Sequence, residues 1–120
     1  MPGPIDAAAF ANLLQMTGGD QEFVDELVDT YLGEGDRLVE NLVVAAAAGR
    51  IEDIILPAHS LKSSSLNVGA LALGELCRRL EEDARGGSVA DPVGSAAEIR
   101  AAFDEARGAL LDERERRLAG

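Results

Sequence analysis

His59 and Lys62 are the residues of this sequence best suited to chemistry, and each is the only residue of its type. They stand three positions apart in a segment expected to be helical, so their side chains share one face. A neutral imidazole nitrogen can attack phosphorus and hold the phosphoryl group as a labile phosphoramidate. An ammonium group one turn away can supply positive charge to the phosphoryl oxygens. The pair therefore predicts a site of phosphoryl transfer.

The helical period places this pair on the solvent side of its segment. At about 100° per residue, the small and apolar residues of the opposite face are Ile54, Ala58, Leu61, Ser65 and Val68. His59, Lys62, Ser63 and Leu66 then point towards solvent, and the serines around His59 are too small to shield it. Ile55 and Leu66 flank the histidine and form an apolar rim of the kind that a transient partner covers.

Simpler interpretations compete with this one. His59 could be an ordinary surface histidine and Lys62 a solvated charge, but their shared exposed face and small neighbours favour a phosphoryl site. The single histidine and the single cysteine, Cys77, lie on separate elements and make no metal-ligand set. The acidic segment 21–40 lacks the spacing of a calcium loop. We expect no metal-binding and no cofactor-binding residues.

Apolar residues at helical spacing predict five helices that position the pair. The expected helices cover residues 5–16, 21–48, 51–68, 70–85, and 93 or 95 to 118. Few aromatic residues and abundant Ala and Leu favour helix over sheet. The expected fold is all-α: an up-down four-helix bundle with a short additional N-terminal helix, in a single domain over residues 1–120.

Glycine and proline indicate where these helices end or deform. Gly33 and Gly35 weaken the second helix and permit a bend there. Pro57 lacks a backbone donor and predicts a kink near residues 53–57. The segment 86–94, which holds Gly-Gly and Asp-Pro, is the one expected loop of any length.

Charge and hydropathy exclude several classes of protein. The net charge of −11 argues against binding nucleic acid or an anionic membrane surface, since both need clustered Lys and Arg. No apolar stretch is long enough to span a bilayer, and the N-terminus lacks the basic and apolar regions of a signal peptide. Cys77 allows no internal disulfide and is expected to be a buried, inert thiol. A cytoplasmic monomer fits these features.

The segment around His59 resembles the histidine-containing phosphotransfer (HPt) domain family. The resemblance rests on His59-x-x-Lys62 followed by small residues, Gly69, Gly18-Gly19-Asp20 upstream, and Leu76-Cys77-x-x-Leu80-Glu81 downstream. It extends over nearly the whole chain. Two residues depart from the family pattern: Ser63 stands where glycine is common, and Pro57 is unexpected inside a helix.

The resemblance implies roles for residues of this chain. His59 would be phosphorylated on Nε2, with Lys62 assisting the phosphoryl group. Glu81 would accept a hydrogen bond from Nδ1 and orient the ring, although it could equally pair with Arg78 or Arg85 on its own helix. Arg78 would line the same site, and a partner would contact Ile55, Ser63, Leu66 and Arg78.

The resemblance also implies a function and partners. Such domains pass phosphoryl groups to and from response-regulator receiver domains, and they receive them in pathways headed by a sensor or hybrid histidine kinase. Mg²⁺ belongs to the receiver, and nothing in this sequence resembles a nucleotide-binding loop, so we expect no kinase activity.

Two other readings of the chain stay open. One is a helical adaptor that binds a partner through the Ile55/Leu66 surface without chemistry. The other is a substrate domain cut from a larger kinase. Met1 and the full set of helices favour a free-standing protein.

Overall fold

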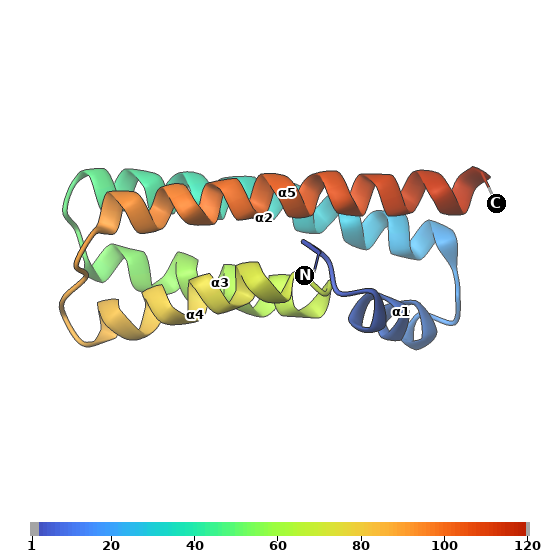
Figure 1. Cartoon of the computed structure of the whole chain (residues 1–120), viewed down its shortest axis with the longest axis horizontal. Helices are drawn as coiled ribbons and strands as arrows, with labels where there is room; N and C mark the ends of the chain where they lie inside the picture. The colour runs from blue at the N-terminus through green and yellow to red at the C-terminus, as the bar shows by residue number, and fades with distance from the viewer. Residues whose placement is uncertain (1–2, 120) are drawn as a thin grey trace.

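The computed structural model describes the backbone of residues 3–119 and the side chains of residues 3–116. The helices are α1 (Ala7–Met16), α2 (Gln21–Ala47), α3 (Glu52–Asn67), α4 (Leu71–Arg85) and α5 (Pro92–Ala119). No strand occurs among the described residues. Each of the four longer helices runs antiparallel to the one before it (Figure 1). The predicted up-down four-helix bundle with an additional N-terminal helix is confirmed.

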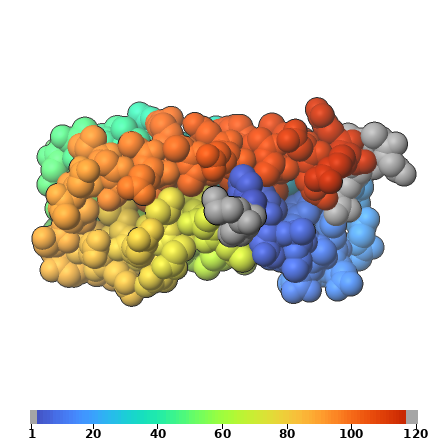
Figure 2. Space-filling model, viewed as in Figure 1, coloured from blue at the N-terminus to red at the C-terminus, as the bar shows by residue number. Residues whose placement is uncertain are grey.

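Helix α1 fills the space left by unequal helix lengths. Helices α2 and α5 have 27 and 28 residues, against 16 in α3 and 15 in α4. Figure 1 shows α1 continuing the layer of α3 and α4, below the overhanging ends of the long pair. The molecule is therefore elongated, 47 × 23 × 22 Å, and α5 covers one long side of it (Figure 2).

The turn between α3 and α4 ties α1 to the bundle. The carbonyl of Gly69 accepts a hydrogen bond from the Asp6 backbone N–H at 2.7 Å, and Asp6 in turn caps α1 by accepting from the Ala9 N–H at 2.8 Å. Gly69 has a φ of 88°, and a Cβ there would lie 3.0 Å from the Asp6 carbonyl oxygen. Glycine is thus needed at this position for both its conformation and its small size.

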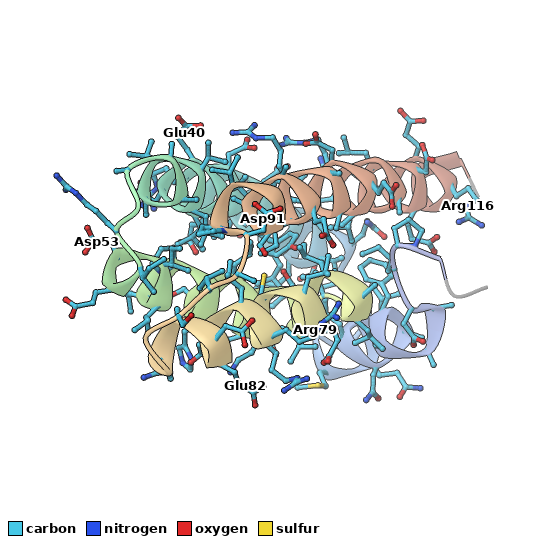
Figure 3. All side chains as sticks on the ribbon, turned by 60° about the vertical axis from the view of Figure 1, so that its left-hand side comes forward. Glu40, Asp53, Arg79, Glu82, Asp91 and Arg116 are labelled. Atoms are coloured by element: carbon cyan, nitrogen blue, oxygen red, sulfur yellow. The ribbon has the colours of Figure 1, made fainter. Side chains whose placement is uncertain are left out.

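Helix α5 begins earlier than its sequence predicted. Its first residue is Pro92, and the preceding Asp91 accepts a hydrogen bond from the Gly94 N–H at 3.0 Å. Proline suits the first helical position because no backbone donor is needed there. The prediction of a loop that extends through Gly94 was therefore wrong. The loop ends at Asp91, which Figure 3 shows at the start of the helix.

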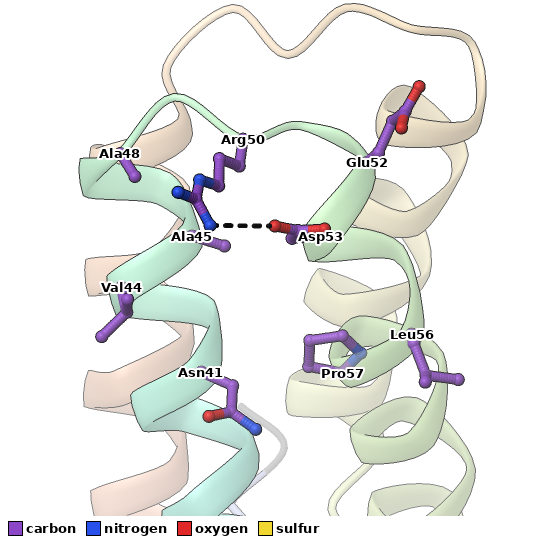
Figure 4. Close-up of a pocket in the computed structure, with 9 residues that line it drawn as sticks. All are labelled: Asn41, Val44, Ala45, Ala48, Arg50, Glu52, Asp53, Leu56 and Pro57. Atoms are coloured by element: carbon purple, nitrogen blue, oxygen red, sulfur yellow. Dashed lines mark ion pairs between the residues drawn. The ribbon is translucent and has the colours of Figure 1, made fainter.

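Neither the kink expected at Pro57 nor the bend permitted by Gly33 and Gly35 interrupts its helix. Helix α3 is continuous from Glu52 to Asn67, with Pro57 inside it and buried. The proline ring lines a shallow groove between α2 and α3, close to the Arg50–Asp53 ion pair at the connecting turn (Figure 4). Helix α2 likewise continues through both glycines that permitted a bend.

Gly35 serves close packing in the helix pair α2 and α5. A Cβ at this position would lie 2.3 Å from Cε1 of Phe103, whose ring is 1% exposed in the core. Gly33, two residues earlier in α2, is exposed and has open space where a Cβ would stand. The two glycines therefore have opposite structural consequences, although they look alike in sequence.

We expect Gly35→Ala to lower the free energy of unfolding by about 1–2 kcal/mol. The added methyl group displaces the Phe103 ring, and overpacking of this kind outweighs the gain in helix propensity. Gly33→Ala is the matched control and should raise stability by up to about 1 kcal/mol. Urea unfolding followed by circular dichroism measures both, and equal effects of the two variants would contradict the packing argument.

The core lies between the four long helices. Its most fully buried large side chains are Val24, Val28, Val39, Leu42, Ile54, Leu61, Leu73, Cys77, Ile99, Phe103 and Leu110. Exposed ion pairs join α2 to α5 at the surface, among them Arg100–Glu40 at 2.9 Å and Arg114–Asp29 at 2.6 Å. Exposed pairs add little stability, so the apolar core holds the helices together. Among the described residues, none of the helices has the length and hydropathy of a transmembrane span.

Candidate functional site

His59 projects from the outer face of α3. Its side chain is 48% exposed, while Ala58 and Leu61 beside it are completely buried. This alternation follows from the helical period, which turns residues 58 and 61 to the core and residue 59 away from it. The histidine is thus held on a rigid element and open to an approaching molecule.

Glu81 of α4 is hydrogen-bonded to the imidazole ring of His59. Its Oε2 lies 2.9 Å from Nδ1 of His59, and the glutamate side chain is only 8% exposed. The turn at Gly69 folds α4 back along α3, which brings together two residues that are far apart in the sequence. Glu81 is one of two buried polar residues among those described, and its surroundings must therefore compensate its charge.

Lys62 makes the largest contribution to that compensation. Its Nζ lies 2.9 Å from Oε1 of Glu81, the oxygen that His59 does not contact. The Lys62 ammonium, with smaller contributions from Arg85 and His59, holds the pKa of the Glu81 carboxyl down at about 2 against the opposing effect of burial. Lys62 was expected to face solvent, but its side chain is only 24% exposed because it reaches across to Glu81.

The ionised carboxylate determines which nitrogen of His59 carries the proton. A carboxylate can only accept hydrogen bonds, so Nδ1 of His59 must be the donor to Glu81. In the neutral ring Nε2 then keeps its lone pair. No hydrogen bond to Nε2 is made by the residues whose side chains are described. Nε2 is therefore free to act as a nucleophile.

Arg85 also belongs to this cluster, although its sequence position predicted only that it competes for Glu81. Its Nε donates to Oε2 of Glu81 at 2.8 Å, the same oxygen that accepts from His59. Glu81 therefore contacts the His59 ring and also pairs with Arg85 on its own helix. The separation of four residues between Glu81 and Arg85 was the available signal.

Arg78 does not join the cluster. It forms ion pairs with Glu75 at 2.6 Å and Glu82 at 2.8 Å, both on its own helix. The Arg78 guanidinium also holds the pKa of Glu75 below its usual range. Arg78 was expected to line the histidine site, but the structure shows its guanidinium held by two carboxylates of its own helix rather than by Glu81.

The surface around His59 is apolar on one side. Leu66 is 45% exposed and lies against Gly74 of α4, where a Cβ would come within 2.5 Å of it. Ser63 is exposed but polar, and Ile55 is apolar but partly buried. Leu66 therefore forms most of the expected apolar rim. Leu56, 72% exposed and not anticipated as part of a surface, lies further along α3 towards α2.

Polar residues behind the site support α3 without joining in chemistry. Ser65 is fully buried and its hydroxyl pairs with that of Tyr31 at 2.8 Å, while Ser64 bonds back to the Ser60 carbonyl at 3.1 Å. Burial raises the pKa of the Tyr31 hydroxyl to about 12. It also raises the pKa of the buried Cys77 thiol to about 12, so this cysteine stays neutral.

Within the described residues, no group of three or more His, Cys, Asp or Glu side chains could hold a metal ion. The cluster of His59, Lys62, Glu81 and Arg85 contains one carboxylate, two cations and one imidazole. Two cations against one carboxylate suit an incoming anion rather than a metal cation.

Comparisons with known proteins agree with this chemistry. A family model described as the Hpt domain matches residues 26–109. Histidine-containing phosphotransfer protein B (HptB) from Pseudomonas aeruginosa PAO1 is similar in structure, with a TM-score of 0.84 and 28% identity over 94% of this chain and 96% of that one. A rice protein assigned as a histidine-containing phosphotransfer protein shares the fold, with a TM-score of 0.78 and 22% identity over 97% and 86% of the two chains. No curated protein sequence matches significantly.

Proposed function

The chain belongs to the Hpt domain family. From that premise we propose that this protein is a phosphorelay intermediate and that His59 is the residue it uses. It accepts a phosphoryl group from a phospho-aspartyl receiver domain or a sensor kinase and passes it to another response-regulator receiver. The observation that carries this proposal is the 2.9 Å contact between His59 Nδ1 and Glu81, on a ring that is 48% exposed. In the neutral ring, that arrangement leaves the lone pair of Nε2 free to attack phosphorus.

The proposed step is a transfer between two nucleophiles. The lone pair of His59 Nε2 forms the nitrogen–phosphorus bond while the bond from phosphorus to the donor aspartate oxygen breaks. The electron pair of that bond leaves with the aspartate carboxylate. The imidazole ring gains positive charge as Nε2 gives up its lone pair, and the Glu81 carboxylate at Nδ1 neutralises that charge. Transfer to the next receiver reverses each change.

The remaining components of the reaction belong to the partner. Mg²⁺ and the acidic pocket are supplied by the receiver domain, and this chain needs no cofactor and has no kinase activity of its own. The exposed Leu66 and Ser63 beside His59 provide a surface for a transient complex.

Incubation with a receiver domain carrying labelled phospho-aspartate tests the proposal. We expect the label to appear on this chain in a form that acid removes and base does not, as a phosphoramidate behaves. Label that resists acid, or no label from receivers that react with other phosphotransfer domains, would contradict the proposal.

Replacement of Lys62 by alanine should slow this transfer about tenfold. The variant loses a point charge one helical turn from His59, while Arg85 still holds Glu81, so the bundle should remain folded. Single-turnover labelling with an excess of phosphorylated receiver measures the rate, and circular dichroism verifies the fold. Unchanged kinetics would remove Lys62 from the mechanism.

A further inference from the structure

Glu81 has more cationic partners than its own charge requires. Oε1 faces the Lys62 ammonium at 2.9 Å, while Oε2 accepts from Arg85 Nε at 2.8 Å and from His59 Nδ1 at 2.9 Å. One carboxylate therefore meets two permanent cations. From this surplus we propose that Arg85 is a positioning residue, which keeps the Glu81 carboxylate against His59 while Lys62 moves to the phosphoryl group. The inference rests on the proposed function.

Lys62 is the cation placed to move. It is one helical turn from His59 on the same face of α3, and its ammonium is a point charge on a flexible chain. Arg85 reaches Glu81 from the next turn of α4, on the side of the carboxylate away from Lys62's oxygen. A phosphoryl group on Nε2 brings nearly two negative charges, and it competes with Glu81 for the Lys62 ammonium.

Arg85 determines whether Lys62 can respond to that competition. The Glu81 side chain is 8% exposed, and a carboxylate so deeply buried is costly without a cationic partner. If Arg85 were absent, movement of Lys62 would leave Glu81 with His59 as its only partner. The carboxylate would then shift towards water and release Nδ1, which slows transfer.

Arg79 offers a matched control on the same helix. It is exposed on α4, as Figure 3 shows, and makes no ion pair or hydrogen bond within the described part of the chain. Its replacement by alanine removes the same charge as replacement of Arg85 does, at a place that does not contact Glu81. General electrostatic effects on the acidic protein therefore appear equally in both variants.

The experiment compares the transfer rates of Arg85→Ala, Arg85→Lys and Arg79→Ala with that of the unmodified chain. Arg85→Ala should be slower about tenfold, as expected for the loss of a charge-assisted hydrogen bond. Arg79→Ala should stay within about twofold. Arg85→Lys keeps the charge and should recover most of the rate, which separates positioning from a loss of folding.

The Nδ1–H proton of His59, observed by nuclear magnetic resonance above neutral pH, provides a second readout. In Arg85→Ala it should match the unmodified chain before phosphorylation, because Lys62 still holds Glu81, and it should broaden through exchange with water afterwards. Equal rates for the Arg85→Ala and Arg79→Ala variants, or an unbroadened Nδ1–H signal in phosphorylated Arg85→Ala, would overturn the inference. If Arg85→Ala is labelled at the normal rate, only the proposed role of Arg85 is refuted. If neither the variants nor the unmodified chain is labelled, the proposed phosphotransfer function is itself refuted.

Discussion

Replacement of His59 by glutamine should lower the rate of labelling by a phosphorylated receiver at least about 1,000-fold. The glutamine amide nitrogen has no available lone pair, so the proposed nitrogen–phosphorus bond cannot form. The side chain is similar in polarity and lies half in solvent, so the surrounding helices should be unaffected. Label transfer followed by gel autoradiography measures the effect.

The control for this variant is its folding and its binding to the receiver. We expect the free energy of unfolding to change by no more than about 0.5 kcal/mol, as for most surface substitutions. Binding to an unphosphorylated receiver should persist, because Leu66 and its neighbours are intact. A variant that retains label would contradict the assignment of His59 as acceptor, whereas a chain that binds but is never labelled would favour an adaptor.

The fold was largely predictable because its signals are local. Asp6 and Asp20 cap the first two helices by accepting from Ala9 and Phe23, as short polar residues before an apolar run do. The signal at Asp91 and Pro92 was equally local, but Asp-Pro also occurs in loops, and only the helix that follows distinguishes the two.

Features that depend on distant contacts could not be read from the sequence. Gly35 looks like a helix breaker, and its purpose appears only when Phe103 of α5 lies over it. The buried hydroxyl pair of Tyr31 and Ser65 likewise joins two residues that are 34 positions apart in the sequence. In both cases the tertiary neighbour determines what the residue does.

In the candidate site, too, local features were predictable from the sequence and features that depend on distant contacts were not. The helical period correctly gave His59 an exposed position, because that depends on α3 alone. The partners of each charged side chain depend on the α3–α4 packing and on competition among nearby carboxylates. Arg78 and Arg85 both lie within four residues of acidic groups on α4, yet only Arg85 reaches Glu81. The sequence alone could not separate them, and the roles of His59, Lys62 and Glu81 stay predictions until they are tested.

Replacement of Glu81 by alanine should slow phosphoryl transfer about 100-fold, and replacement by glutamine about tenfold. Alanine removes both the acceptor for Nδ1–H and the charge that balances the developing imidazolium. The glutamine amide oxygen can still accept from Nδ1, so that variant loses mainly the charge. Single-turnover labelling measures both rates, and Glu82→Ala, an exposed neighbour that pairs with Arg78, is the control.

The dependence of stability on pH should identify Glu81 independently of transfer. Its pKa is about 2 in the folded protein against an ordinary value of 4.5, so ionisation of Glu81 favours the folded state. Because the folded pKa is the lower one, this contribution is complete above the unfolded value and is lost as the pH falls towards 2. The free energy of unfolding of the unmodified chain should therefore exceed that of Glu81→Gln at pH 6 and approach it near pH 2. A difference that does not vary with pH would mean that Lys62 and Arg85 do not lower the pKa of Glu81.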